Sequence, residues 1–204
     1  MQELTRDQGT MIKLAIFDLD GVLLNSKFLS DLIEQKYGIP SDEVFKALFE
    51  NVLKPAEKGS TFKKLQPDLK KWKVDLPENE FLEFWRESER PEVNEEVVLL
   101  LKKLKKNGTK VVLLTDNVPE RMDWLKKKFS FFDLFDKVYC SFELGCLKSN
   151  QKAMDKILSD FGVSPKEAFH VDDNKSIISR SKKLGLSAYH FGSAEGLRKL
   201  IETW

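Results

Sequence analysis

Apolar and polar positions are spaced in two different ways along the chain, and the spacing changes near position 91. Beyond that position, short runs of β-branched and aromatic residues alternate with longer stretches whose apolar residues recur every three or four positions. This pattern predicts strands that alternate with amphipathic helices. The predicted strands cover residues 109–117, 136–141, 168–173 and 186–191, and the predicted helices cover residues 95–108, 119–129, 150–162, 174–185 and 194–204.

One further strand is predicted at residues 13–21, where the sequence reads KLAIFDLDG. Strands that are joined by helical crossovers lie parallel in one sheet, and the helices cover both of its faces. We therefore expect an α/β fold, a three-layer αβα Rossmann-like core with a parallel sheet.

Residues 24–91 interrupt this alternation and have mainly helical spacing. Helices are predicted at residues 31–38, 41–53 and 78–88, with breaks at Pro40, Pro55, Pro67, Pro77 and Pro91. This stretch predicts a helical subdomain that is inserted after the first strand. The expected organisation is a loose N-terminal leader at 1–11, a core formed by 12–23 together with 92–204, and the helical subdomain at 24–91.

Composition excludes several classes of protein. Charged residues make up 33% of the chain but balance to a net charge of +1, so charge gives no reason to expect a nucleic acid or an anionic membrane as partner. No apolar run approaches the roughly 20 residues that span a bilayer, and the first residues are polar, so we expect a cytoplasmic protein. Cys140 and Cys146 are the only cysteines, and we expect buried free thiols in a reducing compartment.

Polar side chains stand at the expected carboxyl ends of four strands. Asp18 and Asp20 follow an apolar run that should be buried, where an unpaired carboxylate would cost several kcal/mol. The other polar residues are Thr115, Asp116 and Asn117 after the second strand, Lys148 beyond the third, and Asp172 and Asp173 after the fourth. Ligands of parallel αβα sheets bind at this edge, so we expect these side chains to share one site.

The types of residue at these strand ends suggest phosphoryl chemistry. Carboxylates in one crevice raise one another's pKa values unless a cation lies among them, and oxygen ligands with open positions suit Mg²⁺. Thr115 offers a hydroxyl and Lys148 a point charge, and both suit the oxygens of a phosphoryl group. A carboxylate beside a metal and a lysine can attack phosphorus and form an aspartyl-phosphate.

With these segments the chain resembles the haloacid dehalogenase superfamily of hydrolases. FDLDGVLLNS at residues 17–26 carries the DxDG core of the superfamily's first signature. Three later segments follow in the family's order: a hydrophobic strand that ends in Thr115, ELGCLK that ends in Lys148, and HVDDN at residues 170–174. The inserted helices resemble the small cap of the superfamily's first subclass, which includes β-phosphoglucomutase, phosphoglycolate phosphatase and sugar-phosphate phosphatases.

The resemblance implies a role for each aspartate. Asp18 would be the nucleophile and a ligand of Mg²⁺. Asp20 would protonate the leaving oxygen and later activate water, with its backbone carbonyl on the metal. Asp173 would ligate the metal directly, whereas Asp172 would act through water, from the second shell or as the alternative ligand.

The resemblance also implies which residues hold the phosphate. Thr115 and Lys148 would bind the phosphoryl group directly. Asp116, together with Asn117, would contribute chiefly backbone contacts to the phosphate. One segment departs from the family pattern, because Ser149, Asn150 and Gln151 follow Lys148 where a proline is common. This departure leaves the substrate unidentified.

The second aspartate favours phosphoryl transfer over dehalogenation. Dehalogenases that attack carbon resemble the same pattern but lack this aspartate, whereas a leaving alkoxide needs a proton. The expected protein is a Mg²⁺-dependent phosphatase of a small phosphorylated metabolite, acting as a monomer or a homodimer. Two alternatives remain open: a phosphomutase of the β-phosphoglucomutase type, and a non-catalytic phosphate-binding protein on the same fold.

Most other polar and aromatic residues are expected to be structural. His170 and His190 lack a metal partner that the sequence makes evident. Lys58 is an exception to inspect, since a flexible loop before Gly59 could carry it to a substrate anion. Five aromatic residues have helical spacing, which predicts packing between helices for most of them, with some facing the crevice: Phe45, Phe49, Phe81, Phe84 and Trp85.

Overall fold

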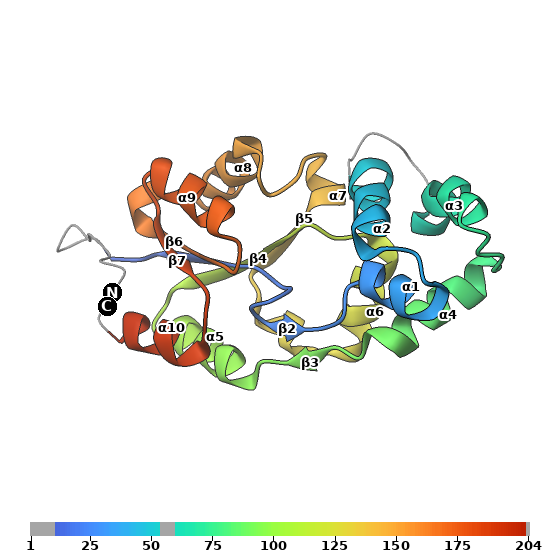
Figure 1. The fold of residues 1–204 in the computed structure, drawn as a ribbon. Coiled ribbons are helices and arrows are strands. Elements are labelled where there is room, and N and C mark those ends of the chain that lie inside the picture. The colour runs from blue at the N-terminus through green and yellow to red at the C-terminus, as the bar shows by residue number, and fades with distance from the viewer. Residues whose placement is uncertain (1–10, 54–59, 203–204) are drawn as a thin grey trace.

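The computed structural model describes residues 11–53 and 60–202. Five parallel strands form its main sheet in the spatial order β5-β4-β1-β6-β7 (Figure 1). These strands are β1 (Leu14–Phe17), β4 (Lys110–Thr115), β5 (Lys137–Cys140), β6 (Ala168–Asp172) and β7 (Ser187–His190). The predicted α/β fold and its five strands are confirmed.

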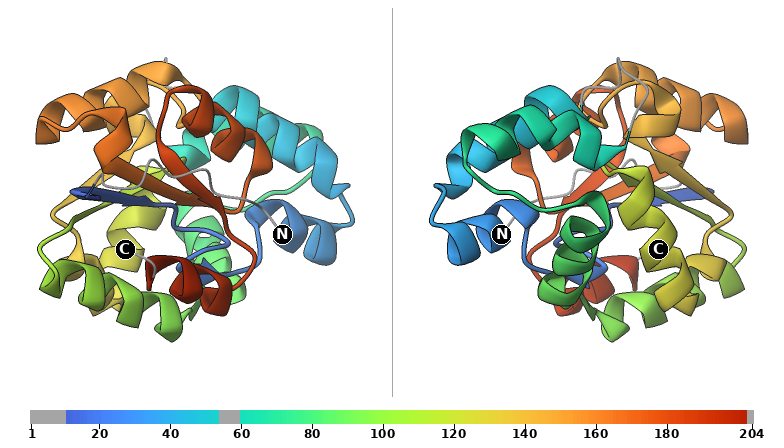
Figure 2. Two further views of the ribbon diagram at one scale, coloured as in Figure 1. Left: turned by 90° about the vertical axis from the view of Figure 1, so that its left-hand side faces the viewer. Right: turned by 90° about the vertical axis from the view of Figure 1, so that its right-hand side faces the viewer.

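Helices cover both faces of the sheet (Figure 2). One face carries α5 (Glu95–Lys106), α6 (Pro119–Lys128) and α10 (Ala194–Ile201), and the other carries α8 (Gln151–Phe161) and α9 (Lys175–Lys183). Shorter elements connect them: η2 (Ser130–Leu134), α7 (Ser141–Leu144) and η3 (Pro165–Glu167).

The central strand β1 explains why its sequence is continuously apolar. Its four residues are all fully buried. Ala15 and Phe17 pack into the core on the α5 face, while Leu14 and Ile16 pack into the core on the α8 face. Successive side chains of a strand point to opposite faces, so a strand that is covered on both sides is apolar throughout.

Helices α1 to α4 form a separate helical insert (residues 29–53 and 60–89) to one side of the sheet (Figure 1). Its elements are α1 (Leu29–Tyr37), α2 (Ser41–Ala47), the π-helical segment η1 (Leu48–Leu53), α3 (Thr61–Lys71) and α4 (Glu78–Glu89). The insert has its own apolar core, which includes Ile33, Leu65 and Phe81.

Two short strands carry the chain into the helical insert and back. β2 (Leu24–Asn25) and β3 (Glu92–Val93) pair in antiparallel fashion, with Leu24 opposite Val93. Sequence spacing does not predict this pair, because two residues are too few to show a period. The limits of 24–91 for the subdomain stay a prediction.

Helix α3 corrects one expectation about the insert. The predicted break at Pro67 is wrong, since Pro67 lies inside α3 on its exposed side. A proline removes one N–H from the helix, and on this side solvent can satisfy the carbonyl that is left without a donor. Ser60 caps the helix and Leu65 and Leu69 are buried, so packing outweighs the cost of the proline.

The aromatic residues of the insert divide into two groups. Phe81 and Trp85 are buried and Phe84 is partly buried, as the helical spacing predicts. Phe45 and Phe49 are exposed instead and line a cavity, which fits the expectation that some of the five face the crevice. The predicted leader and Lys58 lie outside the described residues, apart from Met11.

The two cysteines form no disulfide with each other. Both cysteines are free; Cys140 is buried as expected, whereas Cys146 is only partly buried. Burial raises the pKa of the Cys140 thiol to about 12, so this thiol stays protonated at neutral pH.

Within residues 11–53 and 60–202, every helix is too short or too polar to cross a membrane.

Two phenylalanines of the insert provide a matched test of its core. Phe81→Ala is expected to lower the free energy of unfolding by about 3–5 kcal/mol, because it removes a ring that is only 1% exposed. Phe45→Ala removes the same atoms from a side chain that is 54% exposed, and should cost less than about 1 kcal/mol. Urea denaturation followed by circular dichroism measures both. Equal losses would contradict the assignment of Phe81 to the core.

Candidate functional site

The polar residues at the strand ends meet at one edge of the sheet. Asp18 follows β1, Thr115 ends β4, Asp172 ends β6, and Lys148 lies between α7 and α8. A cavity of about 390 Å³ between this edge and the helical insert is lined by Asp18, Asp20, Thr115, Asp116, Asn117, Lys148 and Asp173. The structure therefore brings the predicted site residues together, with Asp172 fully buried next to Lys148.

Lys148 supplies a positive charge at the centre of the site. Its Nζ lies 2.6 Å from Asp18 Oδ2 and 2.9 Å from Asp172 Oδ2. Burial lowers the pKa of Lys148, but the attraction of Asp18 and Asp172 outweighs this effect and the pKa lies above its ordinary value. Lys148 is therefore fully protonated at neutral pH.

The loop around Lys148 is held without a proline after the lysine. The backbone N–H of Lys148 donates to Asp116 Oδ1 at 2.7 Å. Asn150 accepts from the backbone N–H of Lys152 at 3.0 Å and so caps the start of α8. These hydrogen bonds fix the two ends of the loop.

Asp18 is difficult to ionise in this position. Burial raises the pKa of Asp18 to about 8, Lys148 acts in the opposite direction, and Asp172 and Asp20 add to the rise. The N–H of Leu19 donates to Asp18 Oδ1 at 2.8 Å. A fully ionised Asp18 at neutral pH therefore needs more positive charge than Lys148 supplies.

Three carboxylates at the site have the arrangement of a metal-binding group. Asp18, Asp172 and Asp173 each offer one oxygen, and these oxygens lie within 4.8 Å of one another. Burial raises the pKa of Asp173, and Asp172 adds to this effect. Such a group fits a divalent cation that prefers oxygen ligands, such as Mg²⁺, because the cation would supply the missing positive charge.

Gly21 lets the loop after β1 approach this group of carboxylates. Its φ is +78°, which is in the left-handed region that favours glycine. A Cβ at this position would lie 2.2 Å from Asp173 Oδ2. Any other residue at this position would therefore displace the Asp173 carboxylate.

The side chain of Asp20 contacts a residue that sequence analysis does not identify. Arg121 Nη1 and Nη2 donate to Asp20 Oδ2 and Oδ1 at 2.9 and 2.6 Å, which makes a bidentate ion pair. Asn117 Nδ2 also donates to Asp20 Oδ2 at 3.2 Å. Arg121 lies in the first turn of the helix that follows Thr115, and this position is the one signal in the sequence that places it near the site.

Arg121 also connects the site to the segments at the two ends of the helical insert. Its Nε and Nη2 donate to Glu89 Oε1 at 2.9 and 2.6 Å, at the end of α4. Its Nη2 lies 3.3 Å from Ser26 Oγ, just before α1. Glu89 is only 1% exposed, so it depends on Arg121 to neutralise its charge. Burial lowers the pKa of Arg121, but Asp20 and Glu89 together raise it above its ordinary value.

The first turn of α6 makes a second contact with the insert. Glu120 accepts hydrogen bonds from the backbone N–H and the hydroxyl of Thr61 at 2.9 and 2.7 Å. Val118, just before α6, packs into the apolar core of the insert. This turn therefore positions the insert over the site.

Asp116 and Asn117 take part with their side chains as well as their backbone. Asp116 accepts the bond from Lys148 that is described above, and burial raises the pKa of Asp116. Asn117 Nδ2 lies 3.4 Å from Thr115 Oγ1, and its backbone N–H donates to Ser141 Oγ at 3.2 Å. These side chains therefore support the loop itself, and the expected backbone contacts to a phosphate stay a prediction.

Both histidines have structural surroundings. His170 is fully buried, its Nδ1 lies 2.7 Å from Ser181 Oγ, and burial lowers its pKa to about 4, so it is neutral at pH 7. His190 Nε2 lies 2.9 Å from the backbone oxygen of Asp173 and so supports the loop that carries this carboxylate.

Known proteins are similar to this chain in sequence and in fold. The family model that is described as a haloacid dehalogenase-like hydrolase matches residues 12–178. The candidate pyrophosphatase PpaX of Clostridium perfringens is 28% identical over 193 residues, which cover 86% of this chain and 81% of that protein. The D-ribitol-5-phosphate phosphatase of Bacteroides thetaiotaomicron is 34% identical over 85 residues, which cover 39% of this chain and 41% of that protein.

Among solved structures, a similar fold occurs in a HAD family enzyme from Bacteroides thetaiotaomicron, in complex with magnesium and inorganic phosphate. The TM-score is 0.72 at 23% sequence identity, and the match covers 87% of this chain and 93% of that chain.

Gly21→Ala is expected to weaken the binding of Mg²⁺ by about tenfold or more, because the added Cβ displaces the Asp173 carboxylate. Gly38→Ala is a matched control, since Gly38 also has a positive φ, of +71°, but an added Cβ there meets no atom within 4 Å. Calorimetric titration with Mg²⁺ measures both variants. Equal affinities would contradict the placement of Asp173 in the cation site.

Arg121→Met is expected to lower the free energy of unfolding by about 3–5 kcal/mol, because it leaves the buried Glu89 without its partner. The double variant with Glu89→Leu should regain the part of this loss that comes from the buried Glu89 charge, although Asp20 still lacks its bidentate partner. Urea denaturation of the two single variants, the double variant and the natural protein gives the coupling free energy. Strictly additive losses would show that the two side chains do not depend on each other.

Proposed function

Because the chain belongs to the haloacid dehalogenase-like hydrolases, we propose that it is a Mg²⁺-dependent phosphatase of a small phosphorylated metabolite in the cytoplasm, with an aspartyl-phosphate intermediate. The main support for this proposal is that Asp18 and Asp20 contact different partners. Asp18 contacts Lys148 at 2.6 Å, whereas Asp20 contacts Arg121 at 2.6 Å. Two carboxylates with separate partners suit two separate tasks, those of nucleophile and of acid and base. The phosphatase names of the sequence relatives support the same reaction.

In the first half of the reaction, a carboxylate oxygen of Asp18 attacks phosphorus. The bond between phosphorus and the alcohol oxygen breaks. Asp20, once it is released from its ion pair with Arg121 and protonated, gives its proton to the leaving alkoxide. The products of this half are the free alcohol and the aspartyl-phosphate on Asp18.

In the second half, water attacks the phosphorus of the aspartyl-phosphate. Asp20, now ionised, takes the proton of the water, and the bond between phosphorus and the Asp18 oxygen breaks. This step restores both carboxyl groups to their starting state and releases inorganic phosphate.

Lys148 and Thr115 are the groups that we expect to hold the phosphoryl oxygens. The Lys148 ammonium already contacts Asp18, so a phosphoryl group that approaches this carboxylate also meets a positive charge. Thr115 is 1% exposed at the end of β4 and adds a hydroxyl donor at the same edge. Together they orient the phosphoryl group toward Asp18.

We expect Mg²⁺ to be held by the carboxylates of Asp18 and Asp173, with Asp172 acting through water or as the alternative ligand. The backbone carbonyl of Asp20 would be a further ligand. When bound, the cation would neutralise the phosphoryl oxygens and favour the ionised form of Asp18. Burial raises the pKa of Asp18 despite the contact with Lys148, so a further positive charge beside this carboxyl group would favour the ionised form.

The test uses p-nitrophenyl phosphate, whose phenolate leaves without a strong acid. Asp18→Asn is expected to lose phosphate release by about three orders of magnitude or more. Asp20→Asn should still form the aspartyl-phosphate but hydrolyse it slowly, which gives a burst of one p-nitrophenolate for each site. Excess chelator should abolish the activity of the natural protein, and added Mg²⁺ should restore it.

Asp133→Asn, in η2 and away from the cavity, is the control and should keep full activity. Near-normal turnover in Asp18→Asn would remove the nucleophile from the proposal. Formation of an isomeric phosphate ester without free phosphate would instead identify a phosphomutase.

A further inference from the structure

The cavity at the site has two sides of different chemistry. Its floor is formed by the polar residues at the strand ends, and its roof by residues of the helical insert and of the linker before α1. Ten roof residues line the cavity, and eight are apolar: four aromatic residues and four leucine or valine residues. The roof's polar members in the described chain are Lys27 and Ser30. Lys27 is exposed, with Nζ 3.4 Å from Gln35 Oε1, and Ser30 is only 3% exposed, so polar groups form a small part of this roof.

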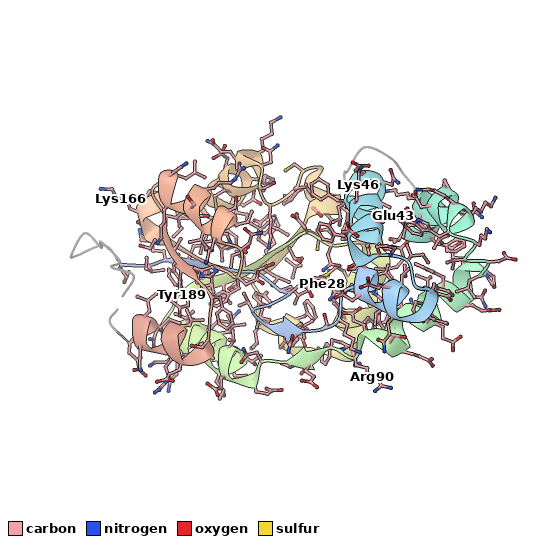
Figure 3. The ribbon with its side chains drawn as sticks, viewed as in Figure 1. Phe28, Glu43, Lys46, Arg90, Lys166 and Tyr189 are labelled. Atoms are coloured by element: carbon pink, nitrogen blue, oxygen red, sulfur yellow. The ribbon has the colours of Figure 1, made fainter. Side chains whose placement is uncertain are left out.

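Exposed aromatic rings are concentrated on this roof. Phe28, Phe45 and Phe49 line the cavity and are 58%, 54% and 40% exposed. They are three of the five large apolar side chains that are exposed in the described part of the chain. Figure 3 shows Phe28 between the insert and the core. Exposed apolar surface of this kind marks a site that a ligand or partner covers.

The backbone of the roof supports the same interpretation. The π-helical segment η1 directly continues α2, and four of its six residues line the cavity: Leu48, Phe49, Val52 and Leu53. π-helical turns are uncommon and are frequent at functional sites. Here the turn directs two pairs of neighbouring apolar residues toward the cavity.

From this division we infer that the substrate is a phosphate monoester whose alcohol part is an apolar alkyl or aryl group. The inference rests on the proposed function, because it assumes that the phosphate binds at the floor. The carbon chain then packs against the roof, and a cavity of about 390 Å³ lies in the range for a small molecule. A sugar or polyol would leave hydroxyl groups against apolar side chains, which costs binding free energy.

The test compares kcat/KM for methyl, propyl and pentyl phosphate, which have chemically similar leaving groups. The value is expected to rise about fourfold for each added methylene, which corresponds to about 0.8 kcal/mol for each buried CH₂. Pentyl phosphate and D-ribitol 5-phosphate have the same number of carbons and differ in hydroxyl groups. Pentyl phosphate should be hydrolysed about tenfold more efficiently, or better.

A matched pair of variants tests whether the roof causes the preference for longer alkyl chains. Phe45→Ala is expected to lower the ratio of kcat/KM for pentyl over methyl phosphate by about tenfold. Leu99→Ala is the control, because Leu99 is 62% exposed on α5 and does not line the cavity, so the ratio should not change.

The possible outcomes separate the two proposals. A flat alkyl series, or a preference for D-ribitol 5-phosphate or pyrophosphate, overturns the apolar substrate and leaves the phosphatase intact. Phosphate release from none of these compounds, nor from p-nitrophenyl phosphate, overturns the proposed function itself. If Phe45→Ala changes the sedimentation coefficient but not the ratio, the roof is a contact between two copies of the chain, and the inference is wrong.

Discussion

Lys148 places its ammonium group between Asp18 and Asp172 at the carboxyl end of the sheet. A parallel sheet makes this crowding possible, because β1 and β6 are neighbours and end at the same edge. One positive charge does not balance three close carboxylates, and with burial the result is a raised pKa for Asp18. The carboxylates therefore leave an excess of negative charge at this edge, which a divalent cation with oxygen ligands would balance.

The core and the helical insert line different sides of the cavity. The core supplies the charged residues of the floor from the ends of buried strands, from the loop that carries Lys148 and from the first turn of α6, so these side chains have rigid supports. The insert supplies a mainly apolar roof from helices with a separate core. Such a division lets the roof change in the course of evolution without disturbing the charge balance of the floor.

The sequence predicts the core well, because strands that are buried on both faces are apolar throughout and the polar residues after them stand out. It predicts the insert less well. Helical spacing identifies an apolar face but not what covers it, so Phe45 and Phe49 resemble Phe81 until the structure shows them exposed. The pair of Glu89 and Arg121 joins residues that are 32 positions apart, which no local pattern reveals.

Arg121 holds Asp20, Glu89 and Ser26 through a single guanidinium group. Ser26 lies in the connection before α1 and Glu89 is the last residue of α4, so a rotation of the insert relative to the core must stretch or release bonds at Arg121. A molecule that draws the Asp20 carboxylate away from Arg121 would therefore change the free energy of that rotation. By linkage, the rotation would change the binding free energy of the molecule by the same amount. The contacts of the Asp20 carboxylate and the position of the insert are in this way coupled through one guanidinium group.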